Sequence, residues 1–221
     1  MKLGVILSSQ YLTNDLAAEF GKIVPSDLPL ANQPLSSYQI ESIEDHCDKV
    51  IFTLPEGYSS RWIESEVLYC PLGLSLRDVI DFVVGITTEV SEYLFYFGDT
   101  LLTIDYSPNT LYAGKPNYFY PTWHYVQGSR VFAGAFTVNR ADLTGYLSRA
   151  ADTDTLLSQL SSNLNIASAK KWFDFGNYAT YYNGKKRFLE SRSFNNIKVT
   201  RDSILTKNSK DFAKIFYEYH W

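Results

Sequence analysis

The sequence predicts an α/β protein built on one mostly parallel sheet, with helices flanking it and an antiparallel extension. Up to residue 97, apolar runs of strand length alternate with segments whose apolar residues recur at helical spacing. After residue 99, three strand-like segments follow one another with no helix between them, which favours antiparallel additions. Hydrophobic residues make up 45% of the chain and charged residues 20%, so a packed core is expected rather than disorder.

The parallel part of the sheet is expected in the first half of the chain. Its strands are predicted at Lys2–Ser8, Lys49–Leu54, Glu66–Cys70 and Tyr93–Phe97. Helices are predicted between them, at Ser36–Cys47 and Ser75–Ile86. The second helix has five apolar residues at helical spacing, namely Leu76, Val79, Ile80, Val83 and Val84. Strands that alternate with helices of this length indicate βαβ units.

The second half of the chain mixes strands and helices. The antiparallel strands are predicted at Leu101–Tyr106, Tyr118–Gln127 and Arg130–Val138, and a later strand at Asn196–Thr200. Helices are predicted at Arg140–Arg149, Thr153–Leu164, Tyr178–Ser191 and Ser209–Tyr219. A cap signal at Asp152 and Thr153 marks the start of the second of these helices. We found no repeat and no low-complexity linker, so we expect one domain over residues 1–200 and a carboxyl-terminal appendage over residues 201–221.

Composition limits the class of protein. Two cysteines, Cys47 and Cys70, give neither a disulfide framework nor metal-ligand spacing. No apolar stretch approaches the roughly 20 residues that span a bilayer, and the amino terminus lacks signal-peptide features, so a cytoplasmic location is expected. Residues 1–169 hold 9 basic and 19 acidic side chains, whereas residues 170–221 hold 11 and 5. The basic segment suits an anionic ligand or solvated helix faces, and no nucleic-acid-binding motif is present.

Two separated segments each set an aspartate beside a glycine. The first is Phe97-Gly98-Asp99-Thr100, directly after an apolar run typical of a buried parallel strand. The second is Trp172-Phe173-Asp174-Phe175-Gly176-Asn177. Open α/β sheets bind ligands at the carboxyl ends of their strands, and two carboxylates brought together there can hold Mg²⁺ and a nucleotide's phosphates. The structural alternatives are a turn residue for Asp99 and a helix cap for Asp174.

Several segments, in the same order along the chain, resemble the sugar-phosphate nucleotidyltransferase family, in particular its capsule and surface-polysaccharide branch. They are Pro29–Leu35 leading into Tyr38–Glu41, Leu72–Leu76, Gly98–Thr100, Phe132–Phe136, and Trp172–Tyr182 followed by Arg192–Asn195. Pro29–Leu35 resembles the family's Leu-Pro-Val-x-x-x-Pro-Leu-Ile segment, and Leu72–Leu76 resembles its Gly-rich turn. Gly98–Thr100 resembles the Gly-Asp metal motif, and Phe132–Phe136 resembles the Asn-Ala-Gly-Ile-Tyr strand. Trp172–Tyr182 resembles the Trp-x-Asp-x-Gly-His pattern. The resemblance implies a Rossmann-like nucleotide-diphospho-sugar transferase fold, which is also GT-A-like.

The resemblance also implies a reaction and a set of roles. The reaction is Mg²⁺-dependent transfer of a nucleotidyl group from an NTP to a phosphorylated sugar or alcohol, with release of pyrophosphate. Asp99 and Asp174 would bind the metal ion, and Lys22 would contact phosphate beside Asp99. The remaining roles are nucleotide binding by Ser8, Gly73 and Ser75, and acceptor binding by Ala133 and Gly134. Ordinary structural roles remain open for these residues: a turn at Gly73, close strand packing at Ala133 and Gly134, and a solvated loop position for Lys22. A homodimer, or a partner kinase or transferase, is also consistent with the resemblance.

The chain departs from the family at the amino-terminal signature loop. The family's Gly-x-Gly-Thr/Ser-Arg is replaced by Ser8-Ser9-Gln10-Tyr11, and Pro25 is followed by Ser26 where the family has lysine. Asn177 stands where the capsular branch has histidine. A non-catalytic binding or scaffold protein with this fold is therefore an alternative. A GT-A glycosyltransferase is another, although it would show Asp-x-Asp in place of Asp99-Thr100-Leu101.

The carboxyl-terminal segment has two interpretations. Ser203–Lys207 followed by a helix with Glu218 resembles the opening of a kinase-like domain. Alternatively, the final helix packs one apolar face against the domain or a second subunit. That face consists of Phe212, Ile215, Phe216 and Tyr219, which follow the i, i+3, i+4, i+7 pattern.

Overall fold

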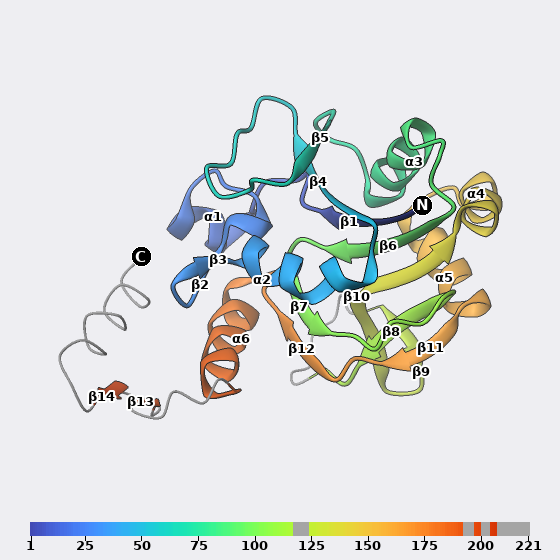
Figure 1. Ribbon diagram of the computed structural model, residues 1–221. Helices are drawn as coiled ribbons and strands as arrows, with labels where there is room; N and C mark the ends of the chain where they lie inside the picture. Colours follow the sequence, from blue (N-terminus) through green and yellow to red (C-terminus); the bar gives the residue numbers. More distant parts are fainter. Residues whose placement is uncertain (117–123, 192–196, 200–203, 207–221) are drawn as a thin grey trace.

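The computed structural model describes residues 1–116, 124–191, 197–199 and 204–206. An eight-stranded sheet forms its centre (Figure 1). The strands are β1 (Lys2–Leu7), β4 (Lys49–Pro55), β5 (Glu66–Cys70), β6 (Glu92–Phe97), β8 (Thr110–Gly114), β9 (Tyr125–Gln127), β10 (Arg130–Asn139) and β11 (Asn165–Ser168). Their order is β11-β8-β10-β6-β1-β4-β5, and β9 pairs with β10. Strand β10 is antiparallel to β6 and β8, whereas β1, β4, β5 and β6 are mutually parallel. The predicted α/β fold class is confirmed.

Strand β1 shows how the sheet is buried on both faces. Side chains alternate between the faces of a strand. Leu3, Val5 and Leu7 accordingly belong to one apolar cluster and Ile6 to another. The pairing of β1 with β6 runs in register to Leu7 and Phe97. Both strands therefore deliver their following loops to the same edge of the sheet.

Three helices cover the first face of the sheet: α3 (Leu76–Ile86), α4 (Arg140–Arg149) and α5 (Thr153–Asn163) (Figure 1). Each begins at a side-chain cap, because Ser75, Asn139 and Asp152 accept hydrogen bonds from backbone N–H groups of the first turn. The cap predicted at Asp152 is confirmed. These helices bury a continuous apolar stripe against the odd-numbered residues of β1.

The opposite face carries a different set of elements. Helix α2 (Leu35–Ile43) lies there, with the two-stranded sheet of β7 (Thr100–Thr103) and β12 (Lys171–Asp174) and helix α6 (Tyr178–Ser191). Further apolar packing comes from α1 (Asn14–Phe20), the 3₁₀ turn η1 (Pro25–Asp27) and the hairpin of β2 (Pro29–Leu30) and β3 (Gln33–Pro34). In Figure 1 these last elements and α6 lie toward the edge where β1 and β6 end.

Several predicted elements differ from the structure. The helix predicted over Ser36–Cys47 stops at Ile43 and continues as the 3₁₀ turn η2 (Glu44–His46), and the strand predicted over Leu101–Tyr106 ends at Thr103. Six helices and strands were not predicted, namely α1, β2, β3, β8, β11 and β12. Two predictions fall partly or wholly outside the described residues: the final helix at Ser209–Tyr219, and residues 118–123 of the strand predicted at Tyr118–Gln127. Two short strands near the carboxyl end are described, β13 (Ile197–Val199) and β14 (Ile204–Thr206), and they pair antiparallel. Among the described helices, none has the length and apolar character needed to cross a membrane.

Candidate functional site

The turn between β6 and β7 carries Asp99 at the carboxyl edge of the sheet. Its backbone lies against the end of β1, since Gly98 N donates to Leu7 O at 2.8 Å. A Cβ atom on Gly98 would lie 2.7 Å from that oxygen and 2.8 Å from Ser8 Oγ. Only glycine therefore fits without displacing the end of β1.

A buried amide fixes this turn from behind. Gln39, on α2, is fully buried, and its Nε2 lies within hydrogen-bond distance of the carbonyl oxygens of Phe97, Gly98 and Thr100, at 3.1, 2.9 and 2.9 Å. These carbonyls bracket Asp99, so the amide holds the backbone on both sides of the carboxylate. The sequence analysis did not identify Gln39. The available signal was a glutamine on the apolar face of a helix, between Tyr38 and Ile43.

The second aspartate arrives through β12, which pairs antiparallel with β7. In this register Asp174 is the partner of Thr100, and Phe175 N donates to Asp99 O at 2.8 Å. The Thr100 hydroxyl lies 3.1 Å from Ala133 O and 3.2 Å from Phe173 O, and it accepts a hydrogen bond from Trp172 Nε1 at 3.1 Å. Thr100 thus joins β7, β10 and β12 behind the two aspartates.

The two carboxylates lie close together around Gly176. A Cβ atom on Gly176 would be 2.8 Å from Asp99 Oδ2 and 3.3 Å from Asp174 Oδ1, so the two oxygens are at most about 6 Å apart. Gly176 N donates to Asp174 Oδ1 at 3.2 Å. The cap of α6 is Asn177, whose Oδ1 accepts from Thr180 N at 3.1 Å, and Asp174 does not fill that role. The predicted convergence of the two aspartates is therefore present.

The electrostatics of the pair favour a cation. Burial, followed by the nearby Asp174 charge, raises the pKa of Asp99 to about 7. Burial also raises the pKa of Asp174, and hydrogen bonds from the Gly176 backbone and the Thr180 hydroxyl oppose that rise. No cluster of three or more His, Cys, Asp or Glu side chains suited to a metal ion occurs within the described residues. Any ion held here would take its remaining ligands from water or substrate.

A cleft of about 210 Å³ opens beside Asp99. Its lining comes from the end of β1, the β6–β7 turn, η1 and the first turns of α3, and consists of Leu7, Ser8, Ser9, Gln10, Pro25, Leu76, Val79, Phe97, Gly98 and Asp99. Apolar side chains form much of this wall. No lysine or arginine is among these described lining residues.

The expected phosphate contacts are arranged differently from the family pattern. Ser26, which stands at the position of the family's lysine, is fully buried, and its N–H donates to Ser8 Oγ at 3.1 Å. The Ser8 side chain is also buried and is used in this internal bond. Lys22 is exposed, and its ammonium lies 4.5 Å from the centre of the Tyr11 ring rather than among the residues lining the cleft.

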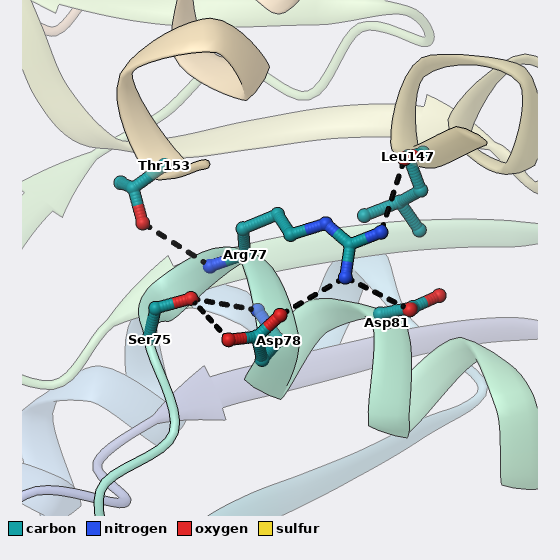
Figure 2. Close-up of polar contacts among 6 residues, drawn as sticks. All are labelled: Ser75, Arg77, Asp78, Asp81, Leu147 and Thr153. Carbon is teal, nitrogen blue, oxygen red and sulfur yellow. Dashed lines mark hydrogen bonds and ion pairs between the residues drawn. The ribbon is translucent and has the colours of Figure 1, made fainter. Parts of the chain in front are cut away.

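The turn before α3 lies next to the cleft. Gly73 is exposed, with a φ of +83° that favours glycine, and Gln10 Nε2 donates to Leu74 O at 3.1 Å. The Ser75 hydroxyl caps α3 and donates to Asp78 Oδ2 at 2.7 Å (Figure 2). Base contact by Gly73 and Ser75 stays a prediction, because the capping role already accounts for the Ser75 hydroxyl.

Arg77 bonds the start of α3 to two acidic side chains of its own helix and to the neighbouring helices (Figure 2). Its guanidinium pairs with Asp78 at 2.9 Å and Asp81 at 3.1 Å, and donates to Leu147 O, in the last turn of α4, at 3.1 Å. Its backbone N–H donates to Thr153 Oγ1, at the start of α5, at 3.4 Å. The first turn of α3 is therefore tied to both neighbouring helices.

Ala133 and Gly134 lie behind Thr100, where β10 bulges. The register of β10 against β8 shifts between Phe132 and Ala135, and Gly134 has a φ of +89°. A Cβ atom there would lie 2.8 Å from Thr100 Cγ2. Both residues are buried, so close packing accounts for their small size, and acceptor binding stays a prediction.

Comparisons with known proteins agree on the fold. No protein-family model matches the sequence, and a sequence search of curated proteins finds no match. Among solved structures, CTP:phosphocholine cytidylyltransferase from Streptococcus pneumoniae is similar, with a TM-score of 0.66, 11% identity, and coverage of 85% of this chain and 99% of that chain. UDP-glucose pyrophosphorylase is similar with a TM-score of 0.62 and 14% identity, over 87% of this chain and 100% of that chain. Inositol-1-phosphate CTP transferase from T. maritima is similar with a TM-score of 0.60 and 12% identity, over 87% of this chain and 98% of that chain. The chain therefore has the nucleotide-diphospho-sugar fold of these nucleotidyltransferases.

Proposed function

We propose that this protein transfers a nucleotidyl group from an NTP to a phosphorylated sugar or related alcohol, making an activated precursor for capsule or surface polysaccharide. The observation that supports this most is the pair Asp99 and Asp174, brought together at the carboxyl edge of the sheet in a nucleotidyltransferase fold. In such folds this edge is where ligands bind.

The donor set fits Mg²⁺. Magnesium prefers carboxylate oxygen ligands and keeps several water or phosphate ligands. The pKa values of the two half-buried carboxylates, Asp99 and Asp174, are raised. The described residues that line the cleft beside Asp99 include no lysine or arginine that could neutralise them. When bound, the ion would neutralise phosphate charge and orient the α-phosphate. Asp99 and Asp174 are the residues that would hold it.

The chemistry requires no side-chain nucleophile. An ionised oxygen of the acceptor phosphate attacks the α-phosphorus of the NTP in line, forming the new P–O bond as the bond to pyrophosphate breaks. The protein contributes position and charge. Ser8, Gly73 and Ser75 would line the nucleotide, Ala133 and Gly134 the acceptor, and Lys22 the phosphates.

A second candidate function is nucleotide or sugar-phosphate binding without catalysis. The specific observation in its favour is the cation-free lining of the cleft among the described residues, together with buried Ser26 at the lysine position. Removing one stabilising donor from the transferring group typically costs about 10²–10³ in rate. A site without its arginine and lysine would therefore bind a ligand but turn it over slowly.

Pyrophosphate release separates the two functions. The full chain would be incubated with each of the four NTPs, Mg²⁺ and a panel of sugar and polyol phosphates. Transfer predicts pyrophosphate release that requires one acceptor and is abolished by Asp99→Asn but retained by Asp105→Asn, whose exposed carboxylate pairs with Lys170. Binding of NTP without release supports the non-catalytic function, and full-rate release by Asp99→Asn contradicts the metal role.

A further inference from the structure

A second and larger cavity shares no lining residue with the cleft. We call it the Trp62 cavity. Its volume is about 790 Å³, within the range of about 300–1,000 Å³ typical of small-molecule sites. It is lined by Phe20, Ile23, Asp27, Pro29, Ala31, Asn32, Gln33, Pro34, Tyr58, Ser59, Arg61 and Trp62. None of these residues lines the cleft beside Asp99, although Pro25 lines the cleft and Asp27, two residues later, lines the Trp62 cavity.

One wall of the Trp62 cavity is formed by residues of the loop between β4 and β5. In Figure 1 this loop arches above α1. A buried carboxylate anchors this loop. Asp27 is 8% exposed, and its two oxygens accept hydrogen bonds from Tyr58 Oη at 2.5 Å and Ser60 Oγ at 2.7 Å. The loop that carries Arg61 and Trp62 is therefore held in place before any ligand arrives, which lowers the ordering cost of binding.

The cationic side chain among the residues that line the cavity is Arg61. The lining carboxylate, Asp27, accepts hydrogen bonds from the Tyr58 and Ser60 hydroxyls through its two oxygens. The Arg61 guanidinium makes neither an ion pair nor a hydrogen bond with any residue that the structure describes. It lies 4.5 Å from the Trp62 ring centre, an arrangement that keeps its planar set of donors available for an oxyanion.

The remaining walls are apolar and aromatic. Phe20, Ile23 and the prolines of the β2–β3 hairpin supply the apolar surface, and Trp62 is 48% exposed. An exposed indole that faces an apolar hollow offers a stacking surface for a flat ring. We propose that the Trp62 cavity is a second ligand site, which takes a flat aromatic or heteroaromatic molecule bearing one anionic group.

The probe for this site is 8-anilino-1-naphthalenesulfonate, which combines a flat naphthalene ring and an anilino group with one sulfonate. Its binding to the full chain would be followed by titration calorimetry, so that loss of a tryptophan does not alter the signal. We expect saturable binding at one site, weakened about tenfold or more by Arg61→Gln and by Trp62→Ala, in line with the loss of a charge-assisted hydrogen bond and of a stacking surface. Both side chains are exposed, so the melting temperature should change little.

Matched controls come from the hairpin of β9 and β10, outside the cavity lining. Tyr125 is 51% exposed, and Arg130 is bonded to Gln127 and Ser168. Tyr125→Ala and Arg130→Gln should leave the affinity unchanged. N-phenyl-1-naphthylamine, which has the same rings without the sulfonate, should bind the wild type and Arg61→Gln equally. The proposal is overturned if the wild type shows no saturable binding, if either cavity variant binds the sulfonate like the wild type, or if the controls lose as much affinity.

Discussion

Asp99→Asn removes one charge from the carboxylate pair and should make the metal-free protein more stable at neutral and alkaline pH. At their greatest separation of about 6 Å, two unit charges repel each other by about 3 kcal/mol at an effective dielectric constant of about 20. The side chains are half-buried rather than sealed from water, so we expect a difference of about 2 kcal/mol. The amide keeps the shape of the carboxylate, so packing around Gly176 changes little.

The sign of the pH dependence follows from the raised pKa. Between the ordinary aspartate pKa of 3.8 and the folded value of about 7, the native state holds a proton that the unfolded chain has lost. The free energy of unfolding of the wild type therefore falls as pH rises through this window. Asp99→Asn lacks this contribution. The variant and the wild type should thus diverge between pH 4 and pH 7, with the variant gaining relative to the wild type as pH rises.

Urea denaturation from pH 4 to pH 9 in the presence of a chelator measures this difference. Asp105→Asn is the control, because the Asp105 carboxylate is exposed and pairs with the Lys170 ammonium instead of a second carboxylate. Adding Mg²⁺ at 100 times its dissociation constant should stabilise the wild type by about 2.7 kcal/mol and Asp99→Asn by almost nothing. A variant whose stability follows the same pH curve as the wild type, with the same response to Mg²⁺, would refute the reasoning.

Four further variants test other contacts. Gly176→Ala puts a Cβ 2.8 Å from Asp99 Oδ2 and should weaken Mg²⁺ binding at least tenfold by calorimetry, whereas Gly85→Ala, whose Cβ meets nothing within 4 Å, should raise helix α3 stability by about 0.5–1 kcal/mol. Equal Mg²⁺ affinities of Gly176→Ala and Gly85→Ala would contradict the expectation for Gly176. Arg77→Met loses the bonds of the guanidinium to Asp81 and to Leu147 O of α4. The free energy of unfolding measured in urea should fall by about 1–2 kcal/mol, and an unchanged urea midpoint would argue against a stabilising network. Lys22→Ala should weaken NTP binding by about 1–3 kcal/mol, and an unchanged affinity would assign the phosphate contact elsewhere.

The sheet was predictable where the local pattern was strong. The strand predicted at Tyr93–Phe97 is β6, and its buried apolar run needs no partner to be recognised. The helix predicted at Ser75–Ile86 is α3, with Ser75 as its cap. In contrast, α1 has only seven residues, and a helix of that length depends on tertiary packing, here through Leu16 in an apolar cluster.

The candidate site was predictable only in part. Asp99 could be placed from the sequence because it follows a strand directly. The holding role of Gln39 could not, because three backbone carbonyls become its partners only after α2 packs against the β6–β7 turn. The same limit applies to Ser26, whose buried bond to Ser8 depends on the path of the chain between β1 and η1.

The position of Asp174 depends on strand pairing across the length of the domain. β12 has four residues, and the short pattern Lys-Trp-Phe-Asp is not by itself diagnostic of a strand. Its partner β7 lies about 70 positions earlier, and the pairing is fixed by Thr100, which bonds to Phe173 O and Trp172 Nε1 at the same time. Because the register sets Asp174 opposite Thr100, the residue after Asp99, a slip of one residue would turn the Asp174 side chain to the other face of the small sheet. The pairing of β7 with β12 is therefore what brings two aspartates from separate segments of the chain into one site.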